Sequence, residues 1–217
     1  LIREIPAILG GNSKLKPHTL SISWLLLAIA EVLPDRIADD DAIKCVDWLV
    51  TQQNKDGGWA SGQHGEPSKV FFTGMAVNAL TETINALPYN AKTSAHHSQI
   101  RRAAFRGLRF FHGTHGTLSP DSILLFSEHA LIQTASDPYC FVSSIVALHA
   151  ILKYARFIGV SEIPNLGPVA QKTYESLQKK YCKDFFSAEL WKTFLPATTE
   201  NHKYFLPAAV LTFLLIK

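Results

Sequence analysis

The sequence contains little of what defines several common protein classes. Its three cysteines, Cys45, Cys140 and Cys182, include no CxxC pair, so they indicate reduced thiols rather than a disulfide framework. The longest apolar runs, such as residues 205–216, are shorter than the roughly 20 residues that cross a bilayer. A formal net charge of +3 is too small to indicate a nucleic-acid partner. These absences predict a cytoplasmic protein with no transmembrane segment.

The composition is that of a globular chain. Hydrophobic residues make up 47% of the 217 residues and charged residues 18%, which argues against intrinsic disorder. No segment has the composition of a linker, so we expect a single domain over residues 1–217. The sequence starts at Leu1 and shows no secretory signal, which leaves open that it is a fragment of a longer chain.

Two kinds of helix are predicted to alternate along the chain. Some segments carry a single apolar stripe, which is typical of outer helices with one buried face. These amphipathic segments are residues 39–53, 100–111 and 169–181. Other segments are apolar on more than one side, which is typical of inner helices. These are residues 18–32, 69–87, 141–158 and 204–216.

The predicted inner helices share a proline at their start. Pro17, Pro67 and Pro138 each stand just before one of them, where a residue without an N–H group is tolerated. Residues 119–136 are predicted to form one extra helix, opened by Ser119 and Pro120. The alternation therefore indicates an all-α chain of helical hairpins with one insertion.

The segment KCVDWLVTQQNKDGGW, residues 44–59, ends the first amphipathic helix and begins a turn. It resembles the QW motif of the squalene-hopene and oxidosqualene cyclases, a repeat that protein prenyltransferase β subunits share more loosely. Only Cys45 departs from the motif, which usually has glycine or alanine there. The matching residues are Lys44, Trp48, Gln53, Asp56, Gly57 and Trp59.

Weaker copies of the motif follow in register. The segment RGLRFFHGTHGTL begins at Arg106 and Gly107 but has His115 and Leu118 in place of glutamine and tryptophan. A very weak third copy is KTYESLQKKYCKDFF. The resemblance implies an α/α toroid, in which inner helices line an apolar cavity. Closed toroids contain about six hairpins, whereas about three hairpins and one leading helix are predicted here, so the ring is expected to be partial or reduced.

The motif is expected to stabilise the fold rather than to catalyse a reaction. Gln53, near the end of an outer helix, is suited to bind carbonyl groups that have lost their intrahelical donors. Asp56 is suited to cap the next helix, and the glycines permit a turn that returns Trp59 toward Gln53. Each residue type meets a local need of the backbone.

The acid motifs of the superfamily are missing. Class II cyclases protonate an alkene or epoxide with a DxDD acid, and class I enzymes hold magnesium against a diphosphate with a motif such as DDxxD. Asp39, Asp40 and Asp41 are contiguous and match neither pattern. We interpret them as an N-cap, whose carboxylates bind free N–H groups and oppose the positive end of the helix dipole.

No metal or cofactor is predicted. Protein prenyltransferases hold zinc with Asp, Cys and His, but the cysteines and histidines here have no convincing ligand spacing. Cys140 and His149 fall on a predicted inner helix, where we interpret them as a buried thiol and a hydrogen-bonded core histidine. GxSxG, phosphate-loop and HExxH motifs are absent, so no catalytic residue is assigned.

These observations favour a terpene-cyclase-like domain without catalysis, which binds an apolar, isoprenoid-like or lipid-like ligand or a protein partner through its inner helices. A second copy of the chain is one candidate for this protein partner. The alternatives are an isoprenoid-processing enzyme, a fragment whose catalytic acid lies outside this chain, and a zinc-dependent prenyltransferase-like subunit. The candidate cavity residues are Trp24, Phe72, Met75, Tyr139, Phe141, His149 and Tyr204. A candidate anion-binding patch consists of Arg101, Arg102, Arg106 and Arg109.

Overall fold

The computed structural model describes residues 17–62, 65–111, 124–126, 131–132, 139–158 and 166–181. Helices dominate this part of the chain, which confirms the all-α class. The helices are α2 (Thr19–Val32), α3 (Asp40–Thr51), α4 (Val70–Ala86), α5 (Ser94–Phe111), α6 (Tyr139–Ile158) and α7 (Leu166–Tyr181). A short 3-10 helix, η2 (Pro34–Arg36), joins α2 to α3. Six of the seven predicted inner and outer helices are thus present, and the seventh, residues 204–216, lies outside the described residues.

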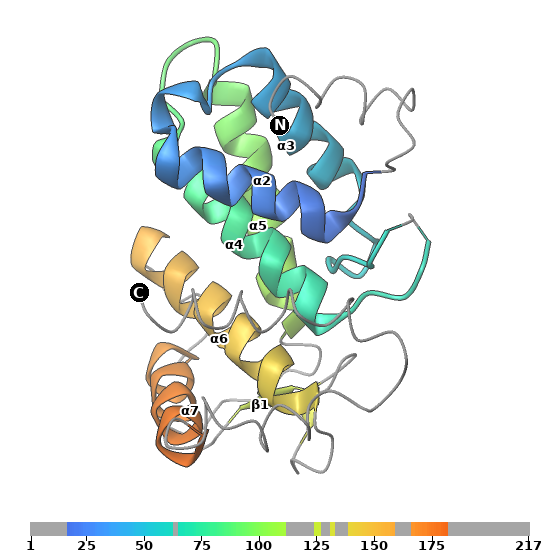
Figure 1. Ribbon diagram of the computed structural model, residues 1–217, viewed down its shortest axis with the longest axis vertical. Helices are drawn as coiled ribbons and strands as arrows, with labels where there is room; N and C mark the ends of the chain where they lie inside the picture. The colour runs from blue at the N-terminus through green and yellow to red at the C-terminus, as the bar shows by residue number, and fades with distance from the viewer. Residues whose placement is uncertain are drawn as a thin grey trace.

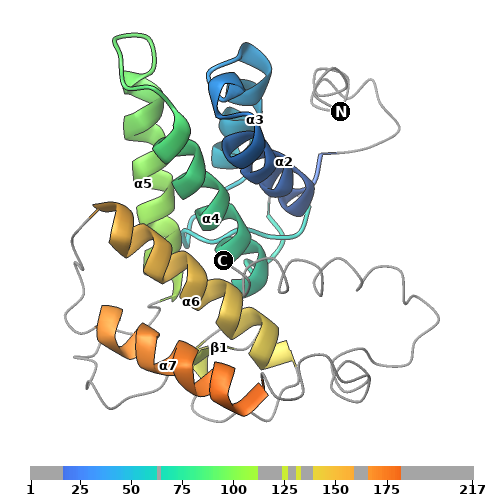
Figure 2. The same ribbon diagram turned by 60° about the vertical axis from the view of Figure 1, so that its left-hand side comes forward.

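The inner and outer helices form two layers. Figures 1 and 2 show α2, α4 and α6 side by side, with α3 along α2, α5 along α4 and α7 along α6. The centre is α4, whose residues are buried on nearly all sides because α2, α5 and α6 all pack against it. This agrees with its apolar character all round.

Close contacts along α4 and α6 keep a nearly constant offset in sequence. A Cβ atom on Gly74 would lie 2.6 Å from Val146, and Asn78 is hydrogen-bonded to His149 at 3.0 Å. One turn further on, Glu82 forms an ion pair with Lys153. An offset that stays constant and positive means that the two inner helices run in the same direction, as Figure 1 also shows. Consecutive hairpins therefore repeat with the same orientation.

The prediction of an extra helix over residues 119–136 is wrong for the part of this segment that the structure describes. Two short antiparallel strands, β1 (Leu125–Phe126) and β2 (Leu131–Ile132), occur there instead. The Leu124 N–H donates to Thr173 Oγ1 at 2.8 Å, and the Phe126 N–H donates to Ser144 Oγ at 2.9 Å. Because side chains of α7 and α6 take these backbone donors, the extended form is held without helical bonds.

The acidic run before α3 also differs from its interpretation as an N-cap. Asp39 occupies the N-cap position but makes no capping hydrogen bond, since its carboxylate pairs with Arg36. Asp40 and Asp41 do lie in the first turn, where negative charge is favourable, and Asp41 also pairs with Lys44 at 3.0 Å. None of the described helices is both long and apolar enough to cross a membrane.

Candidate functional site

Gln53 joins two segments that are far apart in the sequence. It is buried just after α3, and its Nε2 group donates to Gly57 O at 2.7 Å and to Ala103 O of α5 at 2.8 Å. The expected acceptors, the terminal carbonyls of α3, are not the partners found. Gln53 instead links its own turn to the next outer helix.

Trp59 fills the space beneath this turn. Its ring is fully buried, and the indole N–H donates to Leu49 O of α3 at 2.7 Å. Its backbone N–H donates to Thr73 Oγ1 of α4, so the residue contacts both an outer and an inner helix. A Cβ atom on Gly107 of α5 would lie 2.8 Å from the ring, which shows how closely α5 approaches it.

Asp56 stabilises the turn rather than capping α4 directly. Its Oδ1 atom accepts hydrogen bonds from the Gly58 N–H at 2.9 Å and from the Ser68 hydroxyl at 2.8 Å. Ser68 stands just before α4, so the carboxylate joins the turn to the approach of that helix. Gly57 has a φ of 92°, a left-handed conformation that glycine adopts at little cost.

The two remaining motif residues lie on α3. Lys44 is exposed and pairs with Asp41, whereas Trp48 is half-buried and packs against the core. The first residues of the weaker copy meet the first motif. Arg106 donates from Nη2 to Asn54 O at 3.2 Å, and a Cβ atom on Gly57 would lie 2.4 Å from Arg106 O. The start of one copy therefore contacts the turn of the preceding copy.

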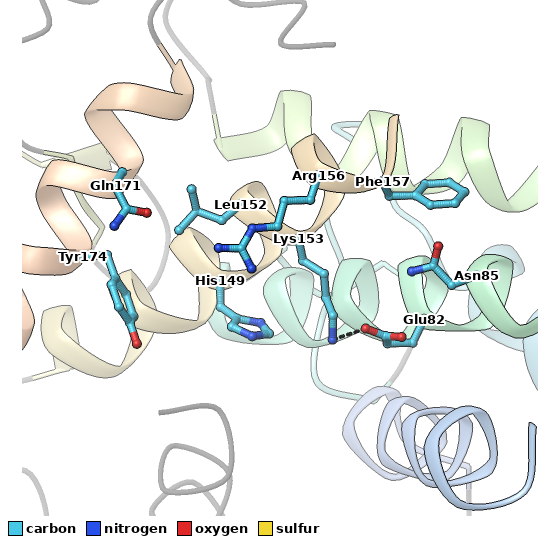
Figure 3. Close-up of a pocket in the computed structure, with 9 residues that line it drawn as sticks. All are labelled: Glu82, Asn85, His149, Leu152, Lys153, Arg156, Phe157, Gln171 and Tyr174. Carbon is cyan, nitrogen blue, oxygen red and sulfur yellow. Dashed lines mark ion pairs between the residues drawn. The ribbon is translucent and has the colours of Figure 1, made fainter. Parts of the chain in front are cut away.

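A cavity of about 660 Å³ lies where α4, α6 and α7 meet. Figure 3 shows charged, amide and aromatic side chains around it, with His149, Lys153 and Arg156 all coming from α6. Among the described residues, those that line it are Glu82, Asn85, His149, Leu152, Lys153, Arg156, Phe157, Gln171 and Tyr174. The lining is thus amphipathic, with polar groups beside the apolar surfaces of Leu152 and Phe157.

Polar contacts between α4 and α6 hold one wall of this cavity. The Glu82 carboxylate and the Lys153 ammonium group form the ion pair drawn in Figure 3. One turn earlier along both helices, His149 Nδ1 is hydrogen-bonded to Oδ1 of the fully buried Asn78. These contacts fix Lys153 and His149 in place on the wall.

Arg156 differs from its neighbours on α6. It is exposed, and it has no ion pair with any residue in the described ranges. Its guanidinium group is therefore available to an anionic group of a ligand, for which its planar set of donors is well suited.

The predicted cavity residues do not lie together around one cavity. Of the four whose side chains the structure describes, only His149 lines this cavity; Met75 is fully buried in the core, and Trp24 and Phe72 are half-buried against it. Tyr139 lies at the start of α6, and nothing is described of its side chain or of that of Phe141. Tyr204 lies outside the described residues.

The other residues of the cavity were not predicted from the sequence. Glu82, Lys153 and Arg156 are charged residues on helices that are otherwise apolar, and this contrast was the available signal. Gln171 and Tyr174 lie on an amphipathic helix, where polar and aromatic residues are common, so nothing in the sequence pointed to them.

Burial changes the acid–base properties of two groups away from the cavity. Burial, with a smaller effect from the nearby Asp41 carboxylate, raises the pKa of the Cys45 thiol to about 12. Burial lowers the pKa of His18 below its ordinary value, and the Glu66 carboxylate opposes part of that shift. Within the described ranges, His, Cys, Asp and Glu side chains form no group of three that could hold a metal ion.

The four arginines of the candidate anion-binding patch all lie on α5. Each is exposed, on the face opposite the buried stripe that contains Ile100, Ala104 and Leu108. A smaller cavity of about 260 Å³ lies between α3 and α5, and both Arg102 and Arg106 line it.

Comparison of this chain with known protein families, with curated proteins and with solved structures finds no match.

Proposed function

We propose that this chain is a terpene-cyclase-like helical-hairpin domain, partial or reduced relative to a closed toroid, that binds a lipid-like ligand without transforming it. The ligand lies in the cavity between α4, α6 and α7, with its polar end at Arg156. The amphipathic lining of this cavity is the observation that carries the proposal.

The chemistry of the cavity favours a ligand with two different ends. Leu152 and Phe157 supply apolar surface, which favours a hydrocarbon chain. Arg156 supplies a guanidinium group that forms strong, charge-assisted hydrogen bonds with carboxylates and phosphates. An ammonium group in the same position would be repelled by Arg156 and Lys153.

Binding without cyclisation is favoured by the state of Glu82, the one carboxylate that lines the cavity in the described part of the chain. Protonation of an alkene needs a neutral carboxyl group in apolar surroundings. Glu82 is instead bound to the Lys153 ammonium group. It is therefore suited to holding the wall rather than to donating a proton.

The relation to the terpene cyclases rests on the contacts between the two motif copies. Gln53 and Asn54 of the first copy bind Ala103 and Arg106 on the next outer helix. These contacts give the motif the structural role that the resemblance implies, and the parallel orientation of α4 and α6 agrees with a chain of repeated hairpins. These contacts support the family proposal in the absence of any matching relative.

The binding proposal is tested by titration calorimetry of the purified protein with dodecanoate, dodecanol, dodecylammonium and farnesol. We expect dodecanoate to bind more tightly than dodecanol, and dodecylammonium to bind most weakly. Arg156→Glu should weaken dodecanoate binding at least about tenfold, which corresponds to about 1.4 kcal/mol, and should improve binding of dodecylammonium.

The matched control is Lys179→Glu, which makes the same change of charge at an exposed position of α7 outside the cavity lining. It should leave all four affinities nearly unchanged. Equal losses in the two variants would show a general effect of charge, and failure of the unaltered protein to bind any of the four compounds would contradict the proposal.

A further inference from the structure

Helix α5 concentrates positive charge on its outer face. Between Ser94 and Phe111 it contains four arginines and no aspartate or glutamate, although the whole chain has a net charge of only +3. All four arginines are exposed, and none forms an ion pair with another described residue. Such a face repels itself, because like charges one turn apart destabilise a helix by a few tenths of a kcal/mol.

Three of these side chains form a ridge along the helix. Arg102, Arg106 and Arg109 follow one another at intervals of four and three residues, so they lie on one face. At 1.5 Å per residue, the ridge is about 10 Å long and its first two members are about 6 Å apart along the axis. Arg101 lies beside it.

The ridge borders a hollow and has one fixed member. The cavity between α3 and α5 is lined by Arg102 and Arg106 together with the polar residues Ser98 and Gln99. Arg106 is held at its position by the hydrogen bond to Asn54 O. Two guanidinium groups therefore stand beside a space large enough for side chains of another molecule.

We propose that this arginine ridge is a docking surface for an acidic peptide segment of a partner protein, independent of the ligand proposed for the α4, α6 and α7 cavity. Alternate residues of an extended peptide lie about 6.7 Å apart on one side, close to the spacing of Arg102 and Arg106. Two carboxylates separated by one residue can thus each meet one guanidinium group, in the geometry that arginine and carboxylate prefer.

Charges beside the ridge favour a short peptide over a nucleic acid or a membrane. Asp47 of α3 is partly exposed and lies 3.8 Å from His96, near the opposite end of α5 from Arg109. A long polyanion or an anionic membrane lying along both helices would meet this carboxylate as well as the arginines. A short acidic segment contacts the arginine end alone, so charge complementarity selects it.

The test uses fluorescence anisotropy with a labelled peptide of alternating Glu and Ser residues. We expect the unaltered protein to bind it, and binding to weaken as salt is added. Replacement of two exposed arginines, Arg102→Ala with Arg109→Ala, should weaken binding at least tenfold. The control pair Lys92→Ala with Lys179→Ala removes the same charge at exposed positions off the ridge and should change binding less than twofold.

Three results would overturn the proposal. The first is failure of the unaltered protein to bind the Glu-Ser peptide, and the second is an equal loss of binding in both double variants. The third is tighter, ridge-dependent binding of a single-stranded oligonucleotide or of vesicles containing phosphatidylserine, which would assign the ridge to another class of partner. Since all four substitutions are at exposed positions, an unchanged circular dichroism spectrum is expected throughout.

Discussion

Single side chains carry the link between consecutive outer helices. Gln53 is the clearest case, because one amide group binds a carbonyl in its own turn and another carbonyl in α5. Gln53→Met keeps the shape of the side chain and removes both donors. We expect the free energy of unfolding to fall by about 1–3 kcal/mol, the cost of leaving buried carbonyl groups without partners.

Urea denaturation measures this change. Gln52→Met is the control, since Gln52 is the adjacent, half-buried residue at the C-cap of α3. The control should lose less than about 0.5 kcal/mol, as is usual for a substitution away from a buried network. Equal losses in the two variants would show that Gln53 does not link the helices in solution.

Cys45 gives a second test on the scale of one residue. Its buried thiol has a pKa of about 12, so almost none of it is the reactive thiolate at neutral pH. We expect iodoacetamide to modify Cys45 only very slowly in the native protein and fully in urea, as measured by mass spectrometry of its peptide. Rapid labelling of the native protein would contradict the burial of this side chain.

On the scale of elements, the turn between α3 and α4 packs closely against the neighbouring helix α5. Gly57 and Gly65 both have positive φ angles, but only Gly57 faces another segment, with Arg106 O 2.4 Å from where a Cβ atom would lie. Both alanine variants are strained by the backbone conformation, at a cost of about 1 kcal/mol. Gly57→Ala must also push α5 away from the turn.

We therefore expect Gly57→Ala to lower the melting temperature clearly more than Gly65→Ala, whose added methyl group meets no described residue within 4 Å. Differential scanning calorimetry of the two variants measures the difference. Similar melting temperatures would mean that α5 does not press on this turn.

Helices with a strong apolar period were predictable, because the pattern that buries one face of α3 or α5 is local in the sequence. Strand β1 was not predictable. The hydroxyl groups that bind the backbone beside and within it, those of Thr173 and Ser144, belong to later helices. For the same reason, Gln53 was recognised as structural but its partner Ala103 was not. The cavity depends on the register between α4 and α6, which no local pattern contains.

For the molecule as a whole, the parallel inner helices and the linked outer helices form one repeating arrangement. The motif contacts join the turn after α3 to α5 on the outer side, and the cavity opens where α4, α6 and α7 meet. The outward arginine ridge and the cavity use different faces of the hairpins. Exposed Val32 and Leu33 at the end of α2 add apolar surface, but a protein partner or a second copy there stays a prediction.

Photo-crosslinking can show directly whether the cavity between α4, α6 and α7 holds a lipid-like ligand, as we propose. A dodecanoate carrying a diazirine group is bound to the native protein and irradiated, and the modified peptides are identified by mass spectrometry. We expect modification of residues 152–157 and 171–174, suppressed by excess unlabelled dodecanoate. Modification elsewhere, or modification that dodecanoate does not suppress, would contradict the proposal.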